Sequence, residues 1–216
     1  MAKQDILNTI LDVGIIPIVR TDDAGHALYA VEAIYNAGIP VLEVTMTVPG
    51  AIKTLEAACD RFGDSLVLGA GTVLDATTAR TCMLAGAQFC VTPSLDLATI
   101  EICNRYSKCV IPGALTPTEI MTAWDAGASM VKVFPVGAVG GASYIKAVKA
   151  PLPQVLLVPT GGVTLANAGD FFRAGASAVA VGSELVNKRW LMNEDFGRIE
   201  TAARGFLDTV AESRAA

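Results

Sequence analysis

Charged side chains are scarce in this chain of 216 residues: they make up 17%, against about 25% in an average soluble domain. Asp and Glu total 21 and Lys and Arg 16, which gives a net charge of -5, and the basic residues form no cluster. A nucleic-acid partner requires a basic surface, so this balance argues against one. Hydrophobic residues reach 52%, which excludes intrinsic disorder and predicts extensive burial in the core or between subunits.

Long apolar runs and histidines are also lacking. No apolar segment approaches the ~20 residues that cross a bilayer, and Met1–Leu11 lacks the apolar stretch of a signal peptide. We therefore expect a cytoplasmic protein with no membrane partner. The five cysteines show no Cys-x-x-Cys spacing and are expected to be reduced thiols. His26 is the single histidine, so neither a catalytic triad nor a multi-histidine metal site can be built, and we expect no metal and no cofactor.

Eight short apolar runs recur along the chain, with helical segments between them. Their starts lie 20 to 26 residues apart, which leaves room for a strand, a short helix and two short loops. Four helices are expected to end at an Ala-Gly pair, because glycine accepts the left-handed conformation that closes a helix. The runs are Ile15–Val19, Val41–Met46, Leu66–Leu68, Phe89–Thr92, Cys109–Pro112, Met130–Phe134, Val155–Val158 and Ala178–Val181.

The runs are nearly continuously apolar, as in a parallel sheet that helices cover on the outside. Eight such units predict a closed (β/α)8 TIM barrel with an extra N-terminal helix. The alternative, an open doubly wound sheet, calls for Gly-x-Gly-x-x-Gly after the first strand, where Arg20-Thr21-Asp22 stands instead. We expect a single domain over residues 1–216, with the N-terminal helix in 1–13, the barrel core in 14–187 and C-terminal helices in 188–216.

Three charged residues lie within or at the end of predicted strands, where a packed core would reject them. Arg20 closes the first strand, Glu43 lies inside the second and Lys132 inside the sixth. One interpretation is a buried Glu43–Lys132 ion pair that only fixes the strand register, although such pairs add little net stability. The other is catalytic: burial lowers the pKa of a lysine towards the range useful to a nucleophile, and such an amine forms Schiff bases with carbonyl compounds.

Glycine-rich turns follow the predicted seventh and eighth strands. The segments Pro159–Val163 and Val181–Glu184 open onto helices at the place where barrels of this kind bind phosphate. The third strand ends in Gly69-Ala70-Gly71-Thr72, where small residues would let a ligand approach the backbone and Thr72 offers a hydroxyl. These loops predict that the substrate carries an anionic group.

Seven motifs, in this order, resemble those of the 2-keto-3-deoxy-6-phosphogluconate (KDPG) and 4-hydroxy-2-oxoglutarate (KHG) aldolases. The resemblance covers roughly residues 14–187 and implies a (β/α)8 barrel, class I chemistry without metal, and a cytoplasmic homotrimer that acts on a small 2-keto acid, often phosphorylated. The motifs are Glu43-Val44-Thr45, Gly69-Ala70-Gly71-Thr72-Val73-Leu74, Val91-Thr92-Pro93, Pro112-Gly113, Val131-Lys132-Val133-Phe134-Pro135, Pro159-Thr160-Gly161-Gly162-Val163 and Val181-Gly182-Ser183.

The resemblance also implies a role for each matching residue. It makes Lys132 the Schiff-base lysine and Glu43 the general acid and base, while the remaining residues bind the substrate. Some members carry an arginine just after the Glu-Val-Thr strand, where this chain reads Met46-Thr47, so the carboxylate would be held by Arg20 or by Thr47. The substrate-binding residues are Arg20, Thr47 and Thr72 for the carboxylate, Pro93 and Phe134 as walls, and Thr160, Gly161, Gly162, Gly182 and Ser183 around the phosphate.

The resemblance therefore predicts a class I aldolase that cleaves KDPG to pyruvate and glyceraldehyde 3-phosphate. KHG, cleaved to pyruvate and glyoxylate, is a further substrate that the resemblance allows. An aldolase specific for the galacto epimer and a metal-free sugar-phosphate isomerase or epimerase are the alternatives on the same barrel. A non-catalytic binding or assembly protein is a further alternative, but it would give three charged strand residues no purpose.

Overall fold

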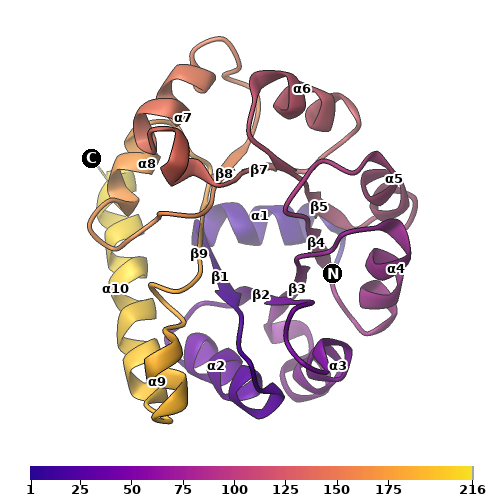
Figure 1. Cartoon of the computed structure of the whole chain (residues 1–216), viewed down its shortest axis with the longest axis vertical. Coiled ribbons are helices and arrows are strands. Elements are labelled where there is room, and N and C mark those ends of the chain that lie inside the picture. The colour runs from indigo at the N-terminus through magenta and orange to yellow at the C-terminus, as the bar shows by residue number, and fades with distance from the viewer. Residues whose placement is uncertain (216) are drawn as a thin grey trace.

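The computed structural model describes residues 1–215, so residue 216 of the expected 188–216 helical region lies outside the described residues. Strands and helices alternate along the chain. In Figure 1 the strands gather round the middle of the molecule and the helices lie outside them. The strands are β1 (Ile15–Val19), β2 (Val41–Thr45), β3 (Val67–Gly71), β4 (Phe89–Val91), β5 (Cys109–Ile111), β6 (Gly113–Ala114), β7 (Val131–Val133), β8 (Leu157–Pro159) and β9 (Val179–Val181).

The helices connect successive strands, and several begin at a side-chain cap. Asp23, Asp75 and Asp96 each accept a hydrogen bond from a backbone N–H in the first turn of the helix that follows, as cap residues do. The α-helices are α1 (Lys3–Val13), α2 (Ala24–Asn36), α3 (Ala51–Phe62), α4 (Ala76–Leu84), α5 (Leu97–Arg105), α6 (Pro117–Asp125), α7 (Ala142–Lys149), α8 (Ala168–Arg173), α9 (Lys188–Met192) and α10 (Phe196–Ala215), with short 3-10 turns at Gly63–Ser65 and Val136–Val139.

The predicted helix ends are confirmed. The glycines of the four Ala-Gly pairs all have a positive φ between 90° and 100°; they are Gly38, Gly86, Gly127 and Gly175. The C-terminal region forms two helices, and Asn193 caps the C-terminal end of α9. Among residues 1–215, no helix is long and apolar enough to cross a bilayer.

All strand pairs are parallel. Six strands form a curled sheet in the order β5-β4-β3-β2-β1-β9, and three form a second sheet in the order β6-β7-β8. The predicted fifth strand, Cys109–Pro112, corresponds to β5, which ends at Ile111 and pairs with β4, while β6 begins after Pro112 and pairs with β7. A single bridge between Thr160 and Ala180 links the end of β8 to β9.

The predicted third strand is the least accurate of the eight. We expected Leu66–Leu68, whereas β3 runs from Val67 to Gly71 and includes Gly69, Ala70 and Gly71. Small residues have little strand propensity of their own, but β3 pairs residue for residue with β2 along its whole length. Pairing with the neighbouring strand therefore decides where β3 ends.

Alternate strand residues face two different cores. Residues such as Ile16, Val41 and Met130 pack together on the inner face of the curl, where Ile6 and Ile10 of α1 join them. Their neighbours along the strands, such as Ile15 and Leu42, pack against the surrounding helices. Helix α1 contacts β1, β2 and β5 and crosses behind the strands in Figure 1, so it covers one end of the inner core.

Candidate active site

Lys132 lies on the inner face of β7. It is two residues from Met130 in the inner core, so the two-residue period of a strand directs its side chain inward. Only 5% of Lys132 is exposed. Burial lowers the pKa of its ammonium, the positive charge of Arg20 lowers it further, and the negative charge of Glu43 opposes both effects. The ammonium nitrogen Nζ lies 5.1 Å from the ring centroid of Phe134.

Glu43 lies on the same inner face, on β2. It is 1% exposed, and neither of its carboxylate oxygens has a hydrogen-bond partner among the described residues. Burial raises the pKa of the Glu43 carboxyl, and the charges of Lys132 and Arg20 oppose the rise. The ion pair with Lys132 that would only fix register is therefore not formed. An unpaired buried carboxyl is unfavourable for folding, which indicates a functional reason for its presence.

A cavity of about 920 Å³ opens beside Lys132. Lys132 lines it, together with nine of the ten predicted substrate-binding residues. Those nine are Arg20, Thr72, Pro93, Phe134, Thr160, Gly161, Gly162, Gly182 and Ser183.

Two predicted site residues are not among those that line the cavity. Thr47 is exposed in the loop after β2, where its hydroxyl lies 2.8 Å from that of Thr45. Glu43 is buried and is not among the residues that line the cavity. Of the two candidates for the carboxylate, the structure thus brings Arg20 to the cavity and leaves Thr47 outside it.

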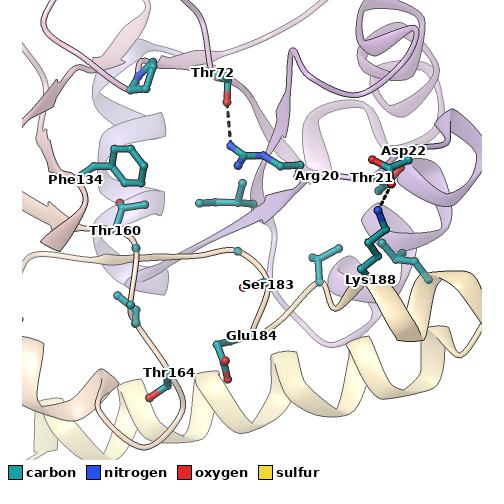
Figure 2. A pocket seen from close by; sticks show the side chains of 18 of the residues that line it. Arg20, Thr21, Asp22, Thr72, Phe134, Thr160, Thr164, Ser183, Glu184 and Lys188 are labelled. Carbon is teal, nitrogen blue, oxygen red and sulfur yellow. Dashed lines mark hydrogen bonds and ion pairs between the residues drawn. The ribbon is translucent and has the colours of Figure 1, made fainter. Parts of the chain in front are cut away.

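Arg20 and Thr72 meet across the cavity rim. The guanidinium of Arg20 donates a hydrogen bond of 3.2 Å to the hydroxyl of Thr72, and Figure 2 shows Phe134 and Thr160 on the opposite side of the same space. Thr72 has a φ of 56°, a conformation that a β-branched residue rarely adopts. Such strain persists only where the surroundings enforce it, and it is common at functional sites.

The loop after β8 presents free backbone donors. Gly161 and Gly162 have φ values of 80° and 91°, and their carbonyls accept hydrogen bonds from Gly137 and from the Asn167 side chain. Within residues 1–215, the N–H groups of Gly162 and Ser183 donate no hydrogen bond. Unpaired N–H groups at a cavity wall are suited to bind an anion.

The sequence reasoning missed the outer part of the cavity. Asp22, Glu184 and Lys188 also line it, as do Leu191 and Met192 of α9. Lys188 forms an ion pair with Asp22 across 166 positions of sequence (Figure 2). No local pattern could have indicated this, because α9 reaches the cavity only through the folding of the C-terminal region.

Together these features define a class of protein. The lysine is largely buried, has a lowered pKa, and lines a cavity that also presents an arginine and free N–H groups. This arrangement suits an enzyme that bonds covalently to an anionic carbonyl compound. Within residues 1–215, no group of three or more His, Cys, Asp or Glu side chains is placed to hold a metal ion.

Comparison with known proteins identifies the family. The chain belongs to the KDPG and KHG aldolase family, whose model matches residues 6–202. It is 37% identical over 172 residues to the 2-dehydro-3-deoxy-6-phosphogalactonate aldolase of Escherichia coli, which covers 79% of this chain and 83% of the relative. It is 30% identical over 207 residues to the 2-dehydro-3-deoxy-phosphogluconate aldolase of Haemophilus influenzae, covering 96% and 97%.

A solved structure supports the same assignment. The KDPG aldolase of Legionella pneumophila, with pyruvate captured at low pH as a covalent carbinolamine intermediate, superposes with a TM-score of 0.86. It is 29% identical to this chain, and the match covers 93% of this chain and 97% of that one. The chain is therefore an aldolase, an aldehyde-lyase of this family.

Proposed function

We propose that the chain is a class I aldolase that forms a Schiff base on Lys132 and cleaves KDPG to pyruvate and glyceraldehyde 3-phosphate. KHG, which would give pyruvate and glyoxylate, is a second substrate of the same site. The observation that carries the proposal is the placement of Lys132: 5% exposed, with a lowered pKa, at the wall of the cavity. The amine nucleophile must be neutral, and burial favours its neutral form.

Lys132 and Glu43 carry out the proposed reaction in turn. The neutral amine of Lys132 adds to the C2 ketone to give a carbinolamine, and loss of water leaves an iminium. Glu43 removes the proton of the C4 hydroxyl through a bound water, the C3–C4 electron pair flows to the iminium, and the aldehyde leaves. Glu43 returns the proton to C3 of the enamine, and hydrolysis releases pyruvate. A carboxyl whose pKa is raised by burial can act both as base and as acid in one turnover.

The two anionic ends of the substrate would bind at opposite parts of the cavity. Arg20 and Thr72, already hydrogen-bonded to each other, would hold the carboxylate of the pyruvyl part. The N–H groups of Gly162 and Ser183 would hold the phosphate. Ser183→Ala should therefore raise KM for KDPG more than KM for KHG, which has no phosphate. Equal effects on both substrates would remove Ser183 from the phosphate site.

Trapping tests the nucleophile directly. Incubation with pyruvate and borohydride should leave a reduced adduct that mass spectrometry maps to Lys132. The cavity offers a matched control, because Lys188 also lines it but is exposed and paired with Asp22. Lys132→Met should abolish the adduct, whereas Lys188→Met should retain it. An adduct on Lys188, or none in the unmodified protein, would overturn the assignment.

The galacto epimer of KDPG is a second candidate substrate. It is favoured by the 37% identity to the E. coli 2-dehydro-3-deoxy-6-phosphogalactonate aldolase. The two sugars differ only in configuration at C4, so steady-state assays coupled to lactate dehydrogenase should compare KDPG, its galacto epimer and KHG. The highest kcat/KM identifies the substrate. Isomerase activity without trapping would instead favour the metal-free isomerase.

We also propose that the strands close into one eight-stranded barrel in a single domain. The split at Pro112 supports this, because its carbonyl accepts a hydrogen bond from the Lys132 N–H and so keeps the fifth strand continuous between β4 and β7. The bridge between Thr160 and Ala180 supports closure at the other junction.

A cytoplasmic homotrimer is the assembly we propose. The 17% charged residues and exposed apolar side chains such as Leu84 and Leu74 support subunit contacts, and the five free thiols fit a reducing compartment. Light scattering on the purified protein decides the assembly: three times the chain mass supports the trimer, and a monomer or dimer contradicts it.

A further inference from the structure

Two glycines of β3 leave the inner face of the strand without side chains. Gly69 and Gly71 both belong to the inner face, beside Glu43 and Thr45 of β2, with which they pair. We expected their small size to let a ligand approach the backbone. Neither lines the cavity, so their missing side chains serve another purpose.

Different groups fill the two spaces. A Cβ atom added at Gly69 would lie 2.6 Å from Cε1 of the Phe89 ring, whereas one added at Gly71 would lie 2.6 Å from the carboxyl carbon Cδ of Glu43. Both distances are below 3.0 Å, which Cβ atoms in proteins essentially never show. Gly69 therefore makes room for core packing, and Gly71 makes room for a carboxyl group.

The backbone itself does not require glycine at either position. Neither residue has a φ in the left-handed region, so an alanine would be compatible with the backbone and the obstacle is steric. The hydroxyl-bearing Thr72, next in the chain, carries the positive φ instead.

We propose that Gly71 is a positioning residue for the proton-transfer step: its lack of a side chain leaves the space that the buried Glu43 carboxyl occupies. This rests on the function proposed above. In this place the charges of Lys132, on β7, and of Arg20, which follows β1, act on the Glu43 carboxyl. An alanine at position 71 displaces the carboxyl from this place, because the three atoms nearest to the added Cβ all belong to Glu43 and none belongs to Lys132.

The test compares four chains: unmodified, Gly71→Ala, Glu43→Asp and the double variant Glu43→Asp/Gly71→Ala. Gly71→Ala should lower kcat at least tenfold, with trapping of pyruvate by borohydride within threefold of the unmodified chain. Its kcat pH profile should also move, because the displaced carboxyl is less buried. Aspartate is one methylene shorter, so Gly71→Ala should reduce kcat less in the Glu43→Asp background than in the unmodified chain.

Two matched controls add the same methyl elsewhere. Gly69→Ala, on the same strand and face, meets Phe89 and should lower the melting temperature without moving the pH profile. Gly197→Ala on α10 meets no atom within 4 Å and should leave activity unchanged.

Several outcomes would overturn the proposal. The first is a Gly71→Ala chain whose kcat is within twofold of the unmodified chain and whose pH profile is unmoved. The second is an equal loss of pyruvate trapping and of substrate cleavage in that variant. The third is an equal effect of Gly71→Ala on kcat in the unmodified and the Glu43→Asp backgrounds. If Gly71→Ala does not fold, Glu43→Ala/Gly71→Ala must fold, since it lacks the obstructing carboxyl; an unfolded double variant contradicts the proposal. If the unmodified chain fails to trap pyruvate, the proposed function is rejected instead. The folding of Gly71→Ala and of Glu43→Ala/Gly71→Ala would still show whether Gly71 makes room for the Glu43 carboxyl.

Discussion

We predict that Thr72 lowers the stability of the folded protein and raises its activity, because it is a β-branched residue with a φ of 56° at the cavity rim. The left-handed conformation is unfavourable by about 1–2 kcal/mol for such a residue, and asparagine tolerates it far better. Thr72→Asn loses the partly exposed hydrogen bond from Arg20, about 0.5 kcal/mol. The net expectation is a gain of about 1 kcal/mol, or a melting temperature about 2–4 °C higher.

The same substitution should reduce activity. It removes a hydroxyl that we place on the substrate carboxylate, and a hydrogen bond to a charged group contributes about 1.5 kcal/mol, so kcat/KM should fall about tenfold. Scanning calorimetry and the coupled assay measure the two effects on the same preparations.

Ser107 provides the matched control. It has a φ of 53° in the exposed position after α5, and it does not line the cavity. Ser107→Asn should stabilise the protein, by less than Thr72→Asn because serine is not β-branched, and should leave kcat/KM unchanged. A Thr72→Asn chain that melts at a lower temperature, or one that is stabilised with full activity, would refute the link between strain and function.

Three further predictions follow from the buried charges and the chain termini. Glu43→Gln should raise the free energy of unfolding at neutral pH, because burial raises the pKa of the Glu43 carboxyl and so disfavours its charged form in the folded protein. The gain should grow as pH rises above about 4.3 and vanish below it, and urea denaturation at several pH values measures it. Arg20→Met should raise the Lys132 pKa and Glu43→Gln should lower it, so the pH dependence of borohydride trapping should move in opposite directions; a common direction contradicts the charge assignment. Arg214 donates hydrogen bonds of 2.6 Å to the carbonyls of Leu11 and Asp12 at the end of α1. Arg214→Ala should therefore destabilise the protein by about 1 kcal/mol without changing kcat. An unchanged melting temperature would show that this contact is not stabilising.

Much of the site could be predicted because strands have a two-residue period. Lys132 is an even number of residues from Met130, and Glu43 from Val41, so the pattern that builds the inner core also points both charged side chains into it. The carboxyl ends of parallel strands meet at one end of the sheet, which is why residues as distant as Arg20, Thr72 and Ser183 line one cavity.

Other features depended on contacts between segments that are far apart in the sequence. The extent of β3 followed from pairing with β2, and the division at Pro112 followed from a change of neighbouring strand. The isolation of the Glu43 carboxyl could not be predicted either, because it depends on the space beside Gly71.

The sequence by itself determined the alternation of strands and helices, the inward direction of Glu43 and Lys132, and nine predicted substrate-binding residues that line the cavity. These depend on local periodicity and on the order of elements, which a single chain displays directly. Only the tertiary structure decided that Thr47 stays outside the cavity, that Lys188 and α9 reach it, and that Glu43 remains buried and unpaired. The reason is that distances between side chains on different elements are set by packing across the whole molecule, and spacing along the chain carries no record of them.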